Sequence, residues 1–221
     1  ANIPRQGPLL IVANHLNLAD PPVVSVSLNR TAMFMAKEEL FRSKFSNYFI
    51  RSFGAFPVHR GRLDRQALRQ AENVLNEGMA LVMFPESKRS PNAQLQAGLP
   101  GSALIAVHSC APILPIGISG TEKMRGPFWI LRRPRITVNI GRPFQLPTVG
   151  LRANRTELTG LTSLIMQHIA ELLPVEFQGD YAKQGKTDAI ENGKGDSHRL
   201  LRRGQTGYRY FGKNSPGAGS G

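Results

Sequence analysis

The stretch PLLIVANHLNLADPP at residues 8–22 decides the fold. Its first half, Pro8–Asn14, is a continuous apolar run, which is typical of a strand buried on both faces of a sheet. Asp20 is followed by two prolines, a pattern typical of the first turn of a helix, and we expect Asp20 to cap that helix. A buried strand that turns directly into a helix is a common beginning of an α/β domain.

Short apolar runs and helix-length amphipathic segments alternate from this stretch to Pro174. Further strands are predicted at Ala32–Ala36, Phe56–His59, Ala80–Phe84, Ile113–Ile118 and Ile136–Ile140. Helices are predicted at Lys37–Phe53, Leu63–Glu77, Gly101–His108 and from about Arg152 to Leu173. The alternation predicts an α/β fold with a largely parallel or mixed β-sheet flanked by helices.

The composition limits the class of protein. The 221 residues include 28 Lys or Arg and 15 Asp or Glu, a net charge of +13, and the 41% of hydrophobic residues suffice for a core. The single cysteine, Cys110, excludes an internal disulfide and a zinc site built from cysteines. No apolar run approaches the roughly 20 residues of a membrane-spanning helix, and no secretory signal is visible. The chain begins with Ala1 just before a strand, so we expect a clipped N-terminus and a missing upstream anchor.

The composition changes near Pro174. Residues 177–221 contain ten of the 22 glycines and only three Val, Ile, Leu or Met residues, too few to bury an apolar core. We therefore predict a folded domain at residues 1–176 and a disordered basic tail at 177–221. The tail carries a net charge of +4, so +9 belongs to the domain, which argues against a nucleic-acid-binding arm.

The first of three polar clusters is NHLNLAD at residues 14–20, between the first strand and helix. A turn there can fold Asp20 back onto His15, although the two residues do not share a helical face. A carboxylate on one ring nitrogen fixes the tautomer and leaves the other nitrogen as a general base. The alternative is a loop histidine beside an ordinary helix cap.

Two further clusters also stand where a predicted strand meets the next segment. In GAFPVHRGR, residues 54–62, Arg60 and the following helix N-terminus suit a phosphate; a solvated arginine in a turn is the alternative. FPESKRS, residues 84–90, combines one carboxylate, two cations and two hydroxyls, which suits a phosphate with a neighbouring hydroxyl. Its alternative is a surface turn with a local charge cluster.

Together with APILPIG at residues 111–117, these clusters resemble, in order, the four motif blocks of the glycerolipid acyltransferase family, which includes the bacterial 1-acylglycerol-3-phosphate acyltransferases. The resemblance extends from about Asn2 to Ala182. It implies that His15 is the general base and that Asp20 orients it. It also implies acceptor and phosphate binding by Arg60, Glu86 and Arg89, and an acyl-donor region at Pro112 and Pro115.

The resemblance implies transfer of a fatty acyl group to lysophosphatidate, giving phosphatidate without a covalent enzyme intermediate. The donor is acyl-CoA or acyl-carrier protein, and no cofactor or metal is expected. Alternatives are another acceptor, such as glycerol 3-phosphate or a different lysolipid, and a non-catalytic lipid-binding relative. The family's third block usually reads FPEGTRS; here Ser87 and Lys88 replace Gly and Thr. A positive φ at Ser87 costs about 1 kcal/mol, and Lys88 adds a cation suited to an anionic acceptor.

Lipid substrates imply contact with a membrane surface, at the cytoplasmic face of the cell membrane. Residues 125–135, RGPFWILRRPR, mix bulky apolar side chains with four arginines, a composition typical of an interfacial patch on an anionic leaflet. Alternatively, these apolar residues face the core.

Other functional classes find little support. Gly179–Thr187 has five residues between its glycines where a phosphate-binding loop requires four. The chain lacks a GxSxG motif and any zinc knuckle or RNA-binding aromatic motif, so no nucleic-acid partner is expected.

Overall fold

The computed structural model describes residues 2–52, 54–58, 64–124, 126, 128–147 and 154–182. Within these ranges, the side chains of five helical residues are not described: Phe45, Ser46, Phe49, Ile130 and Arg132. The predicted tail lies outside the described residues from residue 183 onward.

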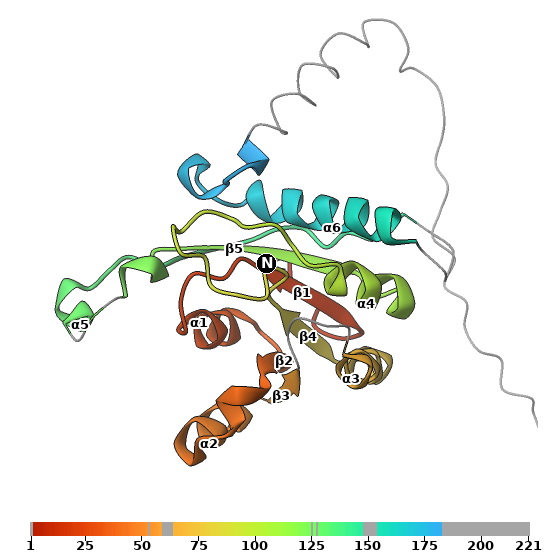
Figure 1. Cartoon of the computed structure of the whole chain (residues 1–221), viewed down its shortest axis with the longest axis horizontal. Helices are drawn as coiled ribbons and strands as arrows, with labels where there is room; N and C mark the ends of the chain where they lie inside the picture. Colours follow the sequence, from red (N-terminus) through yellow and green to blue (C-terminus); the bar gives the residue numbers. More distant parts are fainter. Residues whose placement is uncertain are drawn as a thin grey trace, which may run out of the picture.

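A six-stranded mixed sheet forms the centre of the molecule (Figure 1). Its strands are β1 (Leu9–Ala13), β2 (Ala32–Lys37), β3 (Ala55–Val58), β4 (Ala80–Met83), β5 (Ile113–Ser119) and β6 (Thr137–Ile140). They lie in the order β3-β2-β4-β1-β5-β6, and only β6 pairs antiparallel. The predicted α/β fold is confirmed.

The continuous apolar sequence of β1 follows from its position. Leu10 and Val12 face one hydrophobic core, whereas Leu9, Ile11 and Ala13 face a second core on the other side of the sheet. All five residues are fully buried. A central parallel strand covered on both faces needs apolar side chains at every position, which the sequence supplies.

The helices are α1 (Asp20–Ser27), α2 (Lys44–Ser52), α3 (Arg65–Asn76), α4 (Gly101–Ser109), α5 (Trp129–Arg132) and α6 (Arg155–Ala170). Figure 1 shows α3, α4 and α6 on one side of the sheet and α1 on the other. The connection from β1 to β2 through α1 runs toward β3, whereas α3 and α4 lead back toward β5. Right-handed crossovers that run in opposite directions require their helices on opposite faces.

One predicted helix, Lys37–Phe53, is wrong over its first half. Lys37 remains in the sheet, because its backbone pairs with Val58 of β3. A 3₁₀ turn at Glu38–Phe41 follows, and α2 begins only at Lys44. The apolar side chains of this segment lie in different environments: Leu40 lines a cavity, Phe41 packs against the core and Tyr48 is exposed.

The chain beyond α6 continues to pack against the domain. A 3₁₀ turn at Val175–Phe177 follows Pro174, and Phe177 and Tyr181 are partly buried against the core. The carbonyl of Phe177 accepts a hydrogen bond from Leu95 N at 2.8 Å. The predicted boundary at residues 176 and 177 therefore falls within a packed segment.

The short helix α5 was not predicted, because four residues are too few for a helical period to be visible. It projects from the body of the molecule at the end of a long excursion between β5 and β6 (Figure 1). In the described part of the chain, no helix combines the length and hydropathy needed to span a bilayer.

Gly120 fixes the chain at the end of β5. Its φ is +95°, and a Cβ placed there falls 2.0 Å from the carbonyl oxygen of Arg135. Gly78, after α3, also has a positive φ of +75° but no atom within 4 Å of the corresponding Cβ position.

Gly120 and Gly78 share a positive φ and differ in the space around them, so substitutions at the two positions form a matched pair. We expect Gly78→Ala to destabilise the fold by about 1–2 kcal/mol, the cost of a left-handed non-glycine residue. Gly120→Ala adds a backbone collision and should cost more than about 3 kcal/mol. Urea denaturation of the two variants and the wild type measures both effects, and equal losses would contradict the close approach at Gly120.

Candidate active site

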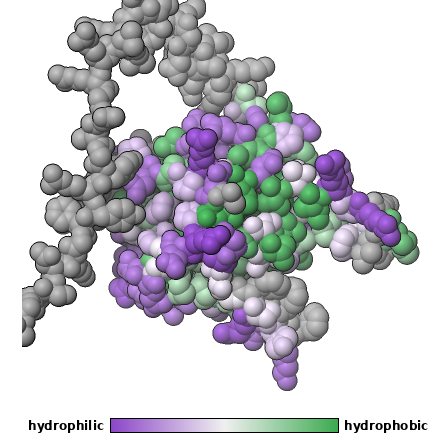
Figure 2. Space-filling model, turned by 180° about the vertical axis from the view of Figure 1, so that it is seen from behind, coloured by the Kyte–Doolittle hydropathy of each residue, from purple (hydrophilic) through white to green (hydrophobic). Residues whose placement is uncertain are grey.

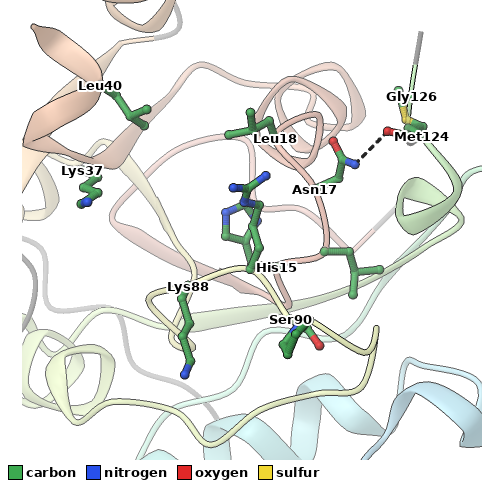
Figure 3. A pocket seen from close by; sticks show the side chains of 12 residues that line it. His15, Asn17, Leu18, Lys37, Leu40, Lys88, Ser90, Met124 and Gly126 are labelled. Carbon is green, nitrogen blue, oxygen red and sulfur yellow. Dashed lines mark hydrogen bonds between the residues drawn. The ribbon is translucent and has the colours of Figure 1, made fainter. Parts of the chain in front are cut away.

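A cavity of about 750 Å³ opens at the carboxyl end of the sheet, where an open α/β sheet places its ligands. The loops after β1, β4 and β5 and the end of β2 form its wall. Figure 3 shows His15 in the middle of the side chains that surround it. The lining residues are His15, Leu16, Asn17, Leu18, Lys37, Leu40, Lys88, Arg89, Ser90, Pro91, Met124 and Gly126.

His15 and Asp20 meet as the sequence predicted. The Nδ1 of His15 lies 2.8 Å from Oδ2 of Asp20, and both side chains are buried. A carboxylate accepts hydrogen bonds, so Nδ1 carries the proton and Nε2 has its lone pair available. The imidazole ring also stacks on Phe84, with 4.4 Å between ring centroids. These two contacts fix the tautomer and the plane of the ring.

The prediction that Asp20 caps α1 is wrong. Ala19 occupies the cap position, and no side chain caps this helix. The Oδ2 atom of Asp20 instead accepts from the main-chain N–H groups of Leu16 at 2.6 Å and Asn17 at 2.7 Å, in addition to the imidazole. The carboxylate points away from the helix because these three donors compensate its buried charge.

Asn14 lies between β1 and the histidine and is almost fully buried. Its side-chain amide donates to Ile118 O at 2.9 Å and accepts from Ile118 N at 2.7 Å. The side chain thus continues the pairing of β1 with β5 beyond Ala13. Both polar groups of the Asn14 side chain therefore bond to the backbone of β5, and the residue holds the start of the loop in place.

Glu86 does not line the cavity. It is only 3% exposed, and its two oxygens accept from His15 N at 2.7 Å and Gln96 N at 2.9 Å. Burial raises the pKa of Glu86 to about 7; the two N–H bonds act in the opposite direction, and Asp20 adds to the increase. The acceptor-binding role implied by the resemblance therefore has no geometric counterpart at Glu86.

The positive φ expected at Ser87 is present, at 60°. This conformation carries the chain from Glu86, which points inward, to Lys88 and Arg89, which are exposed and line the cavity. The turn closes with a hydrogen bond of 2.9 Å from Ser87 N to Phe84 O. One loop thus places a buried carboxylate and two cations in four consecutive residues.

Lys37 is a further cation of the cavity wall, which the sequence motifs do not include. It forms a 3.1 Å ion pair with Glu39, and both side chains are nearly half exposed. A strand was predicted to end at Ala36, and the ends of parallel strands share an edge of the sheet. Because Lys37 directly follows that predicted strand, its place at the same edge of the sheet as His15 could have been predicted from the sequence.

Of the remaining predicted residues, the described ones, Pro112 and Pro115, do not line the cavity. Arg60 lies outside the described residues. Pro112 immediately precedes β5, and its carbonyl accepts from Leu10 N of β1 at 2.9 Å. Pro115 lies within β5 opposite Val12, so both prolines contribute to the pairing of β1 with β5. The ring of Pro115 lies against Gly141, where a Cβ would approach to 2.8 Å. Among the described residues, no three His, Cys, Asp or Glu side chains gather as metal ligands.

Comparison with known proteins shows which family this chain resembles. A model of the acyltransferase family matches residues 1–119. The chain is 31% identical over 187 residues to the 1-acyl-sn-glycerol-3-phosphate acyltransferase of Streptococcus pneumoniae, which covers 83% of this chain and 65% of the relative. It is 26% identical over 173 residues to the Bacillus subtilis protein of the same name, covering 77% of this chain and 84% of the relative.

A solved structure is also similar. The 1-acyl-sn-glycerophosphate acyltransferase PlsC from Thermotoga maritima superimposes with a TM-score of 0.57 and 26% identity, over 90% of this chain and 71% of that one. This chain therefore spans about two thirds of the length of the pneumococcal relative and somewhat more of the Thermotoga structure.

Proposed function

This chain belongs to the acyltransferase family, and from that premise we propose that it transfers a fatty acyl group from an acyl thioester to lysophosphatidate, giving phosphatidate. The observation that carries the proposal is the buried His15–Asp20 pair at the base of a cavity flanked by three cations. The relatives in Streptococcus and Bacillus are named for acyl transfer to the same acceptor. The thioester is acyl-CoA or acyl-carrier protein.

His15 acts as the general base. Its Nε2 takes the proton from the acceptor hydroxyl as that oxygen attacks the thioester carbonyl, so a C–O bond forms and the C–S bond breaks. Asp20 stabilises the imidazolium through Nδ1–H, and the proton then passes to the departing thiolate. The acyl group moves directly to the acceptor, because a thioester is already activated and needs no covalent enzyme intermediate.

The cations of the cavity wall hold the phosphate of the acceptor. Arg89 and Lys88 follow β4, and Lys37 ends β2, so the three cations come from two separate strand ends. Charge-assisted hydrogen bonds to phosphate orient the hydroxyl toward His15 before reaction. Arg60, which the family resemblance assigns to the same phosphate, remains part of this proposal.

A membrane surface is the source of the lipid substrate. Phe128 and Leu131 are 67% and 78% exposed at the projecting α5, so these side chains do not face the core. Arg133 and Arg135 beside them are also exposed. Figure 2 shows apolar residues gathered on the face next to this projection. An apolar and basic projection suits an anionic leaflet, which for this enzyme is the cytoplasmic leaflet of the cell membrane.

The base is tested first by substitution. We expect His15→Ala to abolish acceptor-dependent thiol release from acyl-CoA, and Asp20→Asn to lower kcat by about 10²–10⁴-fold because the imidazole loses its orienting carboxylate. Thiol release with and without lysophosphatidate, repeated with acyl-carrier protein as donor, measures both. Normal turnover by His15→Ala, in a folded protein, would refute the assignment.

Removal of single cations from the cavity wall tests the proposed acceptor site. We expect Lys88→Ala and Arg89→Ala each to raise KM for lysophosphatidate about 10-fold or more, the effect of one charge-assisted hydrogen bond, with little change in KM for the donor. Arg69→Ala, an exposed arginine on α3, is the matched control. Equal effects of all three variants would show that net charge, and not this site, binds the acceptor.

Membrane contact is tested by the fluorescence of Trp129, the single tryptophan of the chain. Vesicles of phosphatidylglycerol and phosphatidylcholine should shift its emission to shorter wavelength, and added salt should weaken the binding. Phe128→Ser with Leu131→Ser should reduce binding, whereas Val175→Ser, exposed elsewhere, should not. An unchanged spectrum at low salt would exclude α5 as the contact.

A further inference from the structure

The main chain of His15 is held on both sides by the loop that follows β4. Its N–H donates to Oε1 of Glu86 at 2.7 Å, and its carbonyl accepts from Ser90 N at 2.8 Å. The position of the histidine Cα, from which the catalytic ring extends, thus depends on this loop. Of these two contacts, only the one with Glu86 is made by a side chain and can be removed by substitution.

The second oxygen of Glu86 ties the same carboxylate to a more distant part of the loop. Oε2 accepts from Gln96 N at 2.9 Å, so each oxygen receives one main-chain N–H. The carboxylate is buried and absent from the cavity wall, and a ligand in the cavity therefore meets other residues. The hydrogen bonds from His15 N and Gln96 N orient the Glu86 carboxylate between these two main-chain groups and not toward a substrate.

The C-terminal segment supports the far end of this bridge. Leu95 N, next to Gln96, donates to Phe177 O at 2.8 Å. Gly179 lies so close to Leu95 that a Cβ there would come within 2.6 Å of its carbonyl oxygen. Tyr181 is half-buried nearby, and burial raises its pKa, with the charge of Glu86 as a smaller cause. The loop that supplies Gln96 N is thus packed on its outer side.

We propose that Glu86 is a positioning residue, which sets the placement of the His15 ring through the main chain and does not bind the acceptor. This inference rests on the proposed acyl transfer. It gives the third motif block two separate tasks: the carboxylate holds the base, and the two following cations hold the substrate. Loss of the bridge lets the ring move relative to a bound acceptor, which affects the chemical step more than binding.

The test compares Glu86→Gln with Glu72→Gln, a matched change at a distant carboxylate on α3 that pairs with His108. Glutamine keeps the size of the side chain, but its NH₂ group faces one of the two N–H donors, so one hydrogen bond is lost. At about pH 8, above the pKa of Glu86, we expect kcat to fall about 10–100-fold while KM for lysophosphatidate stays within about twofold. Arg89→Ala should show the opposite pattern, and Glu72→Gln should match the wild type.

A readout independent of turnover is the NMR resonance of the His15 Nδ1 proton, which is bonded to Asp20. We expect it to shift or broaden in Glu86→Gln and to remain in place in Glu72→Gln. If Glu86→Gln fails to fold, Glu86→Asp keeps the charge on a shorter side chain that cannot reach both donors, and the same pattern is expected.

A higher KM with unchanged kcat would overturn the proposal and make Glu86 an acceptor ligand. Unchanged kinetics with an unchanged resonance would overturn it as well. A different outcome would refute the proposed function alone. If the wild type transfers no acyl group but the resonance shifts in Glu86→Gln, Glu86 still positions His15, in a protein of different activity.

Discussion

The hydrogen bonds to the Asp20 carboxylate hold together the edge of the sheet at which the candidate active site lies. A fully buried negative charge is unfavourable unless donors surround it, and Oδ2 collects three of them from residues 15–17. The loop between β1 and α1 is therefore wrapped around one oxygen atom. The same contacts that stabilise the charge fix the tautomer of His15, so fold and chemistry depend on one group.

Several features that are unfavourable on their own gather within this edge. Ser87 is not glycine but has a positive φ, and Glu86 is a buried acid with a raised pKa. The Asp20 side chain does not cap α1, the helix that it begins. Each would lower stability at an ordinary position. They occur together where β1 and β4 end, next to a sheet whose strands are packed on both faces, and that rigid base is what can support them.

The sequence predicts those parts of the structure that are encoded by nearby residues. The burial of β1 and the span of α4 follow from apolar runs and periodicity, and the His15–Asp20 pair follows from a short turn. The start of α2 at Lys44 could not be predicted, because pairing between β2 and β3 decides how far the strand extends. The proposed role of Glu86 could not be predicted either, since its partners are main-chain N–H groups, which every residue type except proline supplies.

In the proposed function, the positive charge of the chain serves two kinds of contact that differ in how salt affects them. The proposed membrane contact of Arg133 and Arg135, just after α5, acts through solvent, and the Debye length of about 8 Å at physiological ionic strength weakens such attraction strongly. Lys88 and Arg89 line the cavity, where the proposed acceptor phosphate would displace water, so direct ion pairs there are screened less. Salt should therefore release the enzyme from an anionic surface before it weakens acceptor binding. Because the domain itself carries most of the charge, both contacts belong to the folded part of the chain.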